Sequence, residues 1–196
     1  MTLRGACRGN RRARGARCAL CYTVVMTMHT PHRTSLLGGC AVSKRVHKED
    51  MPAFAQEVLE AWRRDVREHP HTDHAVVVAL LGELGAGKTA LAQQVAHALG
   101  VKDVVTSPTF VIQKSYATQD ADFETLVHID AYRIDDLKEL SVLGFEKTLR
   151  APKTLVLIEW ANRIESLLPP DTLCVSLLHE GEGERRVEYG TYADCS

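Results

Sequence analysis

Eight consecutive residues have the spacing G-x-x-x-x-G-K-T, which is typical of a loop that binds the phosphates of a nucleoside triphosphate. Glycines in such a loop let successive backbone N–H groups turn toward an anion, and the following helix points its positive dipole end at the same place. In this pattern Lys88 reaches the β- and γ-phosphates, and Thr89 offers a hydroxyl to Mg²⁺. The predicted nucleotide-binding residues of this loop are Gly82, Glu83, Leu84, Gly85, Ala86, Gly87, Lys88 and Thr89.

The residues on either side of the loop predict the strand and the helix that must position it. Ala75–Leu81 is an unbroken apolar run of strand length, as expected for a parallel strand that is buried on both faces. After the loop, Leu91, Val95 and Leu99 recur at helical spacing, and Gly100 stands where a helix often ends. Strand, loop and helix therefore follow one another in the order that phosphate binding requires.

Two further apolar runs end abruptly in an acid, one at Leu126–Asp130 and the other at Leu155–Glu159. Both patterns predict strands whose carboxylates lie at the carboxyl edge of a parallel sheet, where ligands bind in doubly wound folds. One acid would hold Mg²⁺, directly or through water, and the other would orient the attacking water. Alternatively, Asp130 caps a helix that begins near Asp135, and Glu159 is a surface acid after its strand.

A short hydroxyl-rich segment, Ser107–Phe110, follows the helix and precedes an expected strand at Phe110–Tyr116. Ser107 and Thr109 are candidate nucleotide-binding residues, because loops of this kind sense the γ-phosphate and its metal ion in switch proteins. An ordinary turn is the alternative, since Ser-Pro pairs are common in turns.

The remaining patterns predict structural elements. Met51–His69 has the apolar spacing of an amphipathic helix, and 137–149 predicts another helix that Gly144 weakens. Leu173–Leu178 and Arg186–Tyr189 predict a C-terminal hairpin. The expected fold class is α/β: a three-layer P-loop NTPase fold with a mostly parallel central sheet and a C-terminal hairpin.

Charge divides the 196 residues into two unequal parts. Residues 1–48 contain ten Arg or Lys and no Asp or Glu, whereas the rest contains fourteen basic and twenty-five acidic residues. We therefore expect a basic, disordered extension over 1–50 and a catalytic domain over 51–196. The acidic domain argues against a broad nucleic-acid-binding face, so we expect no DNA partner. No run reaches the roughly 18 apolar residues of a membrane-spanning helix, so no membrane association is expected.

The extension allows other interpretations. Its arginines precede a modestly apolar stretch at Cys18–Met28, which faintly resembles a signal peptide, and an acid-free start also occurs in organelle transit peptides. The favoured interpretation is a disordered or mis-started segment, with Met26, Met28 or Met51 as alternative starts.

Several ordered blocks together resemble the TsaE family, formerly called YjeE. The resemblance runs from about Val76 to Tyr189. Its blocks are GELGAGKT at Gly82–Thr89, SPTF at Ser107–Phe110, HIDAYR at His128–Arg133, LGFE at Leu143–Glu146 and IEW at Ile158–Trp160. The phosphate loop is shared by many families, but the order of the other blocks is specific to this one.

The resemblance implies a Mg²⁺-dependent ATPase of the cytoplasm that binds ATP and releases ADP. Proteins of this family act with TsaB and TsaD in forming threonylcarbamoyladenosine in tRNA, so tRNA is met only through that complex. By motif match, Lys88 and Thr89 contact the phosphates and Mg²⁺, Glu159 is the magnesium-associated acid, and Asp130 is the acid needed for hydrolysis. Ser107 and Thr109 fall in the switch-like segment.

Two other functions use the same loop. A small-molecule kinase needs an acceptor pocket and often a lid with several arginines. The segment Ile134–Lys153 contains a single arginine, Arg150. A nucleotide-gated binding module with negligible hydrolysis would share every motif above. A regulatory GTPase is disfavoured, because the N/T-K-x-D element that reads guanine is absent from the sequence.

Overall fold

The computed structural model describes residues 42–69 and 73–195. Most of the basic extension, with its suggested targeting patterns and the alternative starts at Met26 and Met28, lies outside the described residues. Within the described part, no helix is both long enough and apolar enough to cross a membrane.

Seven strands of the described chain form one sheet, in the order β1-β7-β6-β2-β5-β4-β3. The four central strands β6, β2, β5 and β4 are parallel to one another, whereas β7 joins β6, β1 joins β7 and β3 joins β4 in antiparallel orientation. This confirms the predicted α/β fold with a mostly parallel core and a C-terminal hairpin. The strands are β1 Val42–His47, β2 Val76–Leu81, β3 Gln113–Ala117, β4 Thr125–Asp130, β5 Thr154–Glu159, β6 Leu173–Gly181 and β7 Glu184–Thr191.

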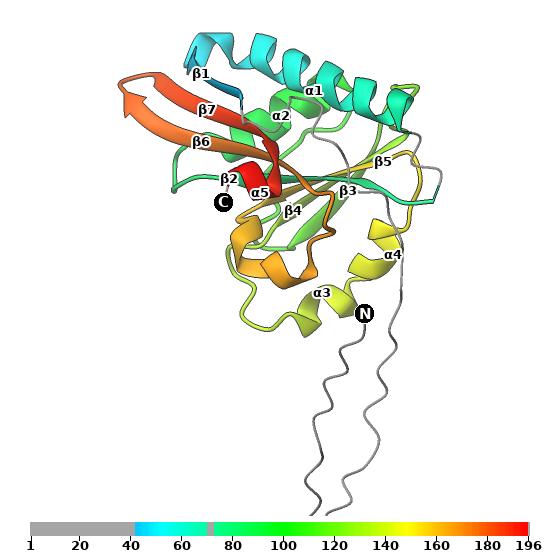
Figure 1. Cartoon of the computed structure of the whole chain (residues 1–196). Helices are drawn as coiled ribbons and strands as arrows, with labels where there is room; N and C mark the ends of the chain where they lie inside the picture. The colour runs from blue at the N-terminus through cyan, green and yellow to red at the C-terminus, as the bar shows by residue number, and fades with distance from the viewer. Residues whose placement is uncertain (1–41, 70–72, 196) are drawn as a thin grey trace, which may run out of the picture. The chain divides into compact units, whose positions relative to one another are not determined.

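Helices cover both faces of this sheet, which gives the three predicted layers (Figure 1). Helices α1 and α2 pack on one face, and α3, α4 and the 3-10 segment η2 pack on the other. Alternate residues of the central strands enter each core, so that Val78 of β2 faces α1 and α2 while Val77 faces the opposite layer. The helical segments are η1 Lys48–Asp50, α1 Met51–Glu68, α2 Lys88–Ala98, α3 Lys138–Val142, α4 Phe145–Leu149, η2 Ala161–Leu167 and α5 Tyr192–Cys195.

Most element predictions are confirmed, and two are corrected. The single helix expected over 137–149 is two short helices, because Gly144 adopts φ 76° between them. The strand expected from Phe110 begins only at Gln113, since Ile112 has φ 63° and 108–112 forms a turn.

Residues 42–50 belong to the folded domain rather than to the extension in which the predicted boundary at 50/51 places them. β1 pairs with β7 over six residues, from Val42 opposite Tyr189 to His47 opposite Glu184. Val46 is buried in the core beneath α1. A chain that started at Met51 would therefore lose an edge strand.

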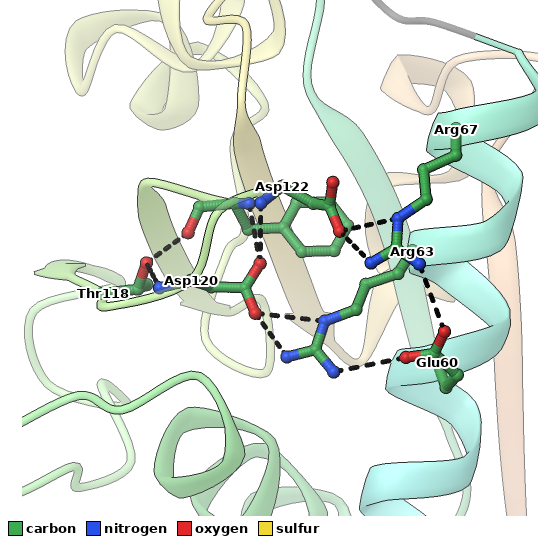
Figure 2. Close-up of polar contacts among 7 residues, drawn as sticks. Glu60, Arg63, Arg67, Thr118, Asp120 and Asp122 are labelled. Atoms are coloured by element: carbon green, nitrogen blue, oxygen red, sulfur yellow. Dashed lines mark hydrogen bonds and ion pairs between the residues drawn. The ribbon is translucent and has the colours of Figure 1, made fainter.

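An ion-pair network joins α1 to the connection between β3 and β4 (Figure 2). Arg63 donates from Nε (3.0 Å) and from Nη2 to Oδ2 of Asp120. The other carboxylate oxygen accepts backbone N–H bonds from Asp122 (2.9 Å) and Phe123 (3.0 Å). Beside it, Arg67 donates to the more exposed Asp122 at 2.7 and 3.2 Å. The network fixes the connection against the helix and keeps Phe123 in the core.

Asp120 is ionised in this network. Burial alone would raise its pKa, but Arg63 and the two backbone N–H groups outweigh that effect and lower the pKa below its ordinary value. A lowered pKa contributes stability above the pKa of the unfolded chain, and that stability is lost as the pH falls through the folded value.

The substitution Arg63→Met should lower the free energy of unfolding by about 1.5–3 kcal/mol, because Asp120 keeps its charge in a site with little water. Arg67→Met is the matched control and should cost much less, since Arg67 is 57% exposed. Urea denaturation at pH 7 measures both, and the difference between wild type and Arg63→Met should shrink below about pH 4. Equal losses in the two variants would contradict this interpretation.

Candidate functional site

The glycine loop, residues 82–89, connects the end of β2 to the start of α2. Its three glycines have positive φ angles, 134° at Gly82, 78° at Gly85 and 111° at Gly87. A hydrogen bond from Ala86 N–H to Glu83 O (3.1 Å) closes the turn, and Gly87 occupies the N-cap position of α2. The backbone thus bends around the amino end of the helix, where an anion is favoured.

Lys88 turns back over this loop. Its Nζ donates to the carbonyls of Gly82 and Glu83, at 2.8 Å each, and lies 3.9 Å from the centre of the Trp160 ring. Burial lowers the pKa of Lys88, while the charges of Glu159 and Asp130 oppose that shift. A buried ammonium that contacts only neutral carbonyls and a ring can readily exchange these partners for an anion.

Glu159 lies at the end of β5 and is the centre of a buried polar cluster. Thr89 Oγ1, on the first turn of α2, donates to both of its carboxylate oxygens at 2.8 and 2.9 Å. His128 Nε2 lies 2.9 Å from Oε1 of the same carboxylate. Glu159 and His128 are almost completely shielded from solvent, at 3% and 0% exposure. The cluster joins α2, β4 and β5 at the floor of the site.

Asp130 ends β4 and is directly opposite Glu159 in the parallel register. Its Oδ2 accepts hydrogen bonds from Ser107 Oγ (3.1 Å) and Thr109 Oγ1 (2.5 Å). Its Oδ1 accepts the backbone N–H of Tyr132 at 3.0 Å. The hydroxyl segment predicted from the sequence therefore lies against the second acid.

These groups surround a pocket of about 290 Å³. Gly82, Glu83 and Ala86 were predicted to contact the nucleotide but are not among the residues that line the pocket. The structure does bring the other predicted residues together. Those that line the pocket are Leu84, Gly85, Gly87, Lys88, Thr89, Ser107, Thr109, Asp130 and Glu159.

The donor set at the floor of the pocket fits Mg²⁺. A hydroxyl and two carboxylates are hard oxygen ligands, and Mg²⁺ usually takes one or two protein ligands together with phosphate oxygens and water. In the described part of the chain, no three His, Cys, Asp or Glu side chains gather as a cage for a metal ion. An ion held by Thr89 and Glu159 would therefore depend on a bound phosphate to complete its ligands.

Sequence reasoning missed two residues of this site. His128 carried a usable signal, since it precedes Asp130 by two residues on a strand and so shares its face. Arg185 of β7 carried no signal in the sequence. Its Nε donates to the carbonyl of Ala86 at 2.9 Å, and this contact depends on how the C-terminal hairpin packs.

A model of the family described as "Threonylcarbamoyl adenosine biosynthesis protein TsaE" matches residues 46–187. The chain belongs to the TsaE family. The match includes the glycine loop and both acids, which confirms the resemblance noted in the sequence.

Relatives with this family's name come from several bacteria. The tRNA threonylcarbamoyladenosine biosynthesis protein TsaE of Bacillus subtilis is 36% identical over 113 residues, which cover 58% of this chain and 68% of that protein. The protein of the same name from Mycobacterium leprae is 30% identical over 147 residues, which cover 73% of this chain and 84% of that one.

A solved structure supports the fold. The crystal structure of YdiB from Bacillus subtilis superposes with a TM-score of 0.57 at 27% sequence identity, over 77% of this chain and 85% of that chain. Family and fold therefore agree with the architecture described above.

The substitution Gly82→Ala should destabilise the protein by about 3 kcal/mol or more. A methyl group there would lie 2.3 Å from the carbonyl oxygen of Leu177, in addition to the strain of a positive φ. Gly144→Ala is the matched control, because Gly144 also has a positive φ but nothing lies near the added carbon. Gly144→Ala should cost about 1–2 kcal/mol. Thermal unfolding measures both, and similar losses would contradict the close-approach explanation.

Proposed function

We propose that this protein binds ATP with Mg²⁺ and hydrolyses it, in support of threonylcarbamoyladenosine formation in tRNA together with TsaB and TsaD. The observation that carries the proposal is the convergence of Thr89, Glu159 and Asp130 on the pocket beside the glycine loop. The names of the relatives supply the pathway, since they are tRNA threonylcarbamoyladenosine biosynthesis proteins.

Phosphate binding would use the loop backbone and Lys88. Gly87 and the first residues of α2 line the pocket, so the positive end of the helix dipole lies beside it, and Lys88 is already within the site. A phosphate oxygen would replace the carbonyls of Gly82 and Glu83 as partners of Nζ. That exchange gives the buried ammonium a negative partner, which favours its charged form.

Thr89 and Glu159 would hold Mg²⁺, which when bound neutralises charge on the phosphates. Thr89 can offer an oxygen lone pair to the ion while its O–H still donates a hydrogen bond to the carboxylate of Glu159. His128 keeps Oε1 of Glu159 engaged from the core side, so the carboxylate cannot rotate freely. The geometry of the ion's protein ligands is thus set before the nucleotide arrives.

Asp130 would orient the attacking water and accept its proton. The carboxylate lines the same pocket as Lys88, its residue pairs with Glu159 in the sheet, and one of its oxygens contacts Ser107 and Thr109. Those two hydroxyls can turn toward a γ-phosphate, which would free Oδ2 for water. Hydrolysis therefore requires the segment around Ser107 to change its hydrogen bonds.

The partner surface would include exposed apolar side chains, two of which, Leu84 and Tyr132, also line the pocket. Large apolar side chains that are exposed in the described structure lie in the glycine loop, the 104–111 segment, the turn after β4 and α3. Phe110, for example, is 84% exposed and stacks on Arg133, with 4.5 Å between the guanidinium and the ring centre. Exposed apolar side chains of this kind fit a protein partner. The protein would then contact tRNA only through the complex, in the cytoplasm.

A nucleotide-gated module with negligible hydrolysis remains the second candidate. It is favoured by one observation: Oδ2 of Asp130 accepts two hydrogen bonds within the protein, so the acid is not free to act on water. A partner that moves the 107–109 segment would turn such a module into an ATPase.

Phosphate release by the full chain, measured with Mg²⁺ and ATP, separates these functions. Addition of TsaB, TsaD and tRNA should raise the turnover at least tenfold. Lys88→Ala should abolish ATP binding, whereas Asp130→Ala should lower turnover about 100-fold and change the Kd for ATP less than threefold.

Two results would contradict the proposal. Turnover that stays at the level of Lys88→Ala with all partners present would favour the gated module. An equal loss of affinity and turnover in Asp130→Ala would remove this acid from its role in hydrolysis.

A further inference from the structure

The C-terminal hairpin contacts the outer side of the glycine loop. Arg185 of β7 donates from Nε to the carbonyl of Ala86 at 2.9 Å, and from Nη1 to the carbonyl of Glu184 at 2.9 Å. Arg185 lies in the middle of three paired strands, opposite His179 of β6 and Val46 of β1. The backbone of Arg185 is therefore paired with a strand on each side.

Peptide geometry gives this contact a consequence inside the pocket. The described chain has no cis peptide bonds, so the carbonyl of Ala86 and the N–H of Gly87 point in opposite directions across one planar unit. Arg185 holds the carbonyl on the outer side. Gly85 and Gly87 line the pocket whereas Ala86 and Arg185 do not. A carbonyl held on the outer side by Arg185 leaves the N–H of Gly87 on the pocket side.

This peptide needs an external restraint. Gly87 has no Cβ and adopts φ 111°, so the unit between Ala86 and Gly87 can turn over with little steric resistance. A reversed unit would present the carbonyl oxygen to a phosphate and repel it. A charged donor outside the loop favours the productive orientation, because hydrogen bonds to ionised groups are stronger than neutral ones.

We propose that Arg185 is a positioning residue that fixes the Ala86–Gly87 peptide so that the Gly87 N–H donates to the phosphates of a bound nucleoside di- or triphosphate. The inference rests on the proposed nucleotide binding. It adds that the hairpin, and through it β1, takes part in phosphate recognition without touching the ligand.

The neighbouring arginine offers a matched control. Arg186 is adjacent on β7 but is 48% exposed and pairs with Glu180 and Glu188 on the sheet surface. Arg186→Met removes the same charge from the same strand and leaves the contact with Ala86 intact.

The test measures binding of ADP and of adenosine to the full chain by calorimetry, in wild type, Arg185→Met, Arg185→Lys and Arg186→Met. Arg185→Met should weaken ADP binding about tenfold and leave adenosine binding unchanged, because only the phosphates use the Gly87 N–H. Arg185→Lys keeps a donor and should recover part of the affinity. Arg186→Met should bind ADP as wild type does.

A second measurement does not depend on any variant folding. The ¹⁵N-edited spectrum of the wild type should show a large downfield shift of the Gly87 amide proton when ADP is added. The inference would be overturned, with nucleotide binding intact, if Arg185→Met bound ADP as tightly as the wild type does. It would also be overturned if ADP left the chemical shift of the Gly87 amide proton unchanged. A wild type that binds no ADP at all would overturn the proposed function as well.

Discussion

The parallel pairing of β5 with both β2 and β4 is the constraint on which the site depends. It places Glu159 opposite Leu80, the residue before the last of β2, and opposite Asp130, the last residue of β4. The glycine loop and both acids consequently emerge at one edge of the sheet. Thr89 then reaches Glu159 from the first turn of α2, so a single hydrogen-bonded contact ties the helix to the strand.

The charged side chains of the site are buried, so each of them needs particular partners. Lys88, Asp130 and Glu159 are each less than 5% exposed, and charged groups removed from water are stable only where partners satisfy them. In the structure those partners come from the protein itself: loop carbonyls for Lys88, hydroxyls for Asp130, and Thr89 with His128 for Glu159. Under the proposed function, a nucleotide with its metal ion would enter by replacing some of these partners.

The restraints on the site come from beyond its motifs. Leu177 of β6 limits the residue at 82 to glycine, and Arg185 of β7 holds the outer side of the loop. Arg63 fixes the connection that leads into β4, the strand that ends in Asp130. Elements distant in sequence therefore restrain both the glycine loop and the strand that carries Asp130.

Local patterns were sufficient to predict the loop, both acids and the layers of the fold. Apolar runs that end in a charge mark buried parallel strands. Gly144 was read only as a weak point of one helix, whereas it separates α3 from α4. Local patterns do not predict which strand pairs with a strand far away in the sequence. β1 was assigned to the basic extension because its polar residues resemble that segment, although its position in the sheet is set by β7. Arg185 was missed because its contact with Ala86 depends on how the C-terminal hairpin packs against the loop.

Mg²⁺-dependent binding of ATP is the most direct test of the contact between Thr89 and Glu159. Titration calorimetry of the full chain with ATP, with Mg²⁺ and with EDTA, compares wild type with Thr89→Val, which keeps the shape of the side chain but lacks the hydroxyl. Mg²⁺ should strengthen ATP binding by the wild type, and Thr89→Val should lose that gain while its affinity in EDTA stays the same. An equal gain from Mg²⁺ in both proteins would contradict the assignment of Thr89 and Glu159 to the metal ion.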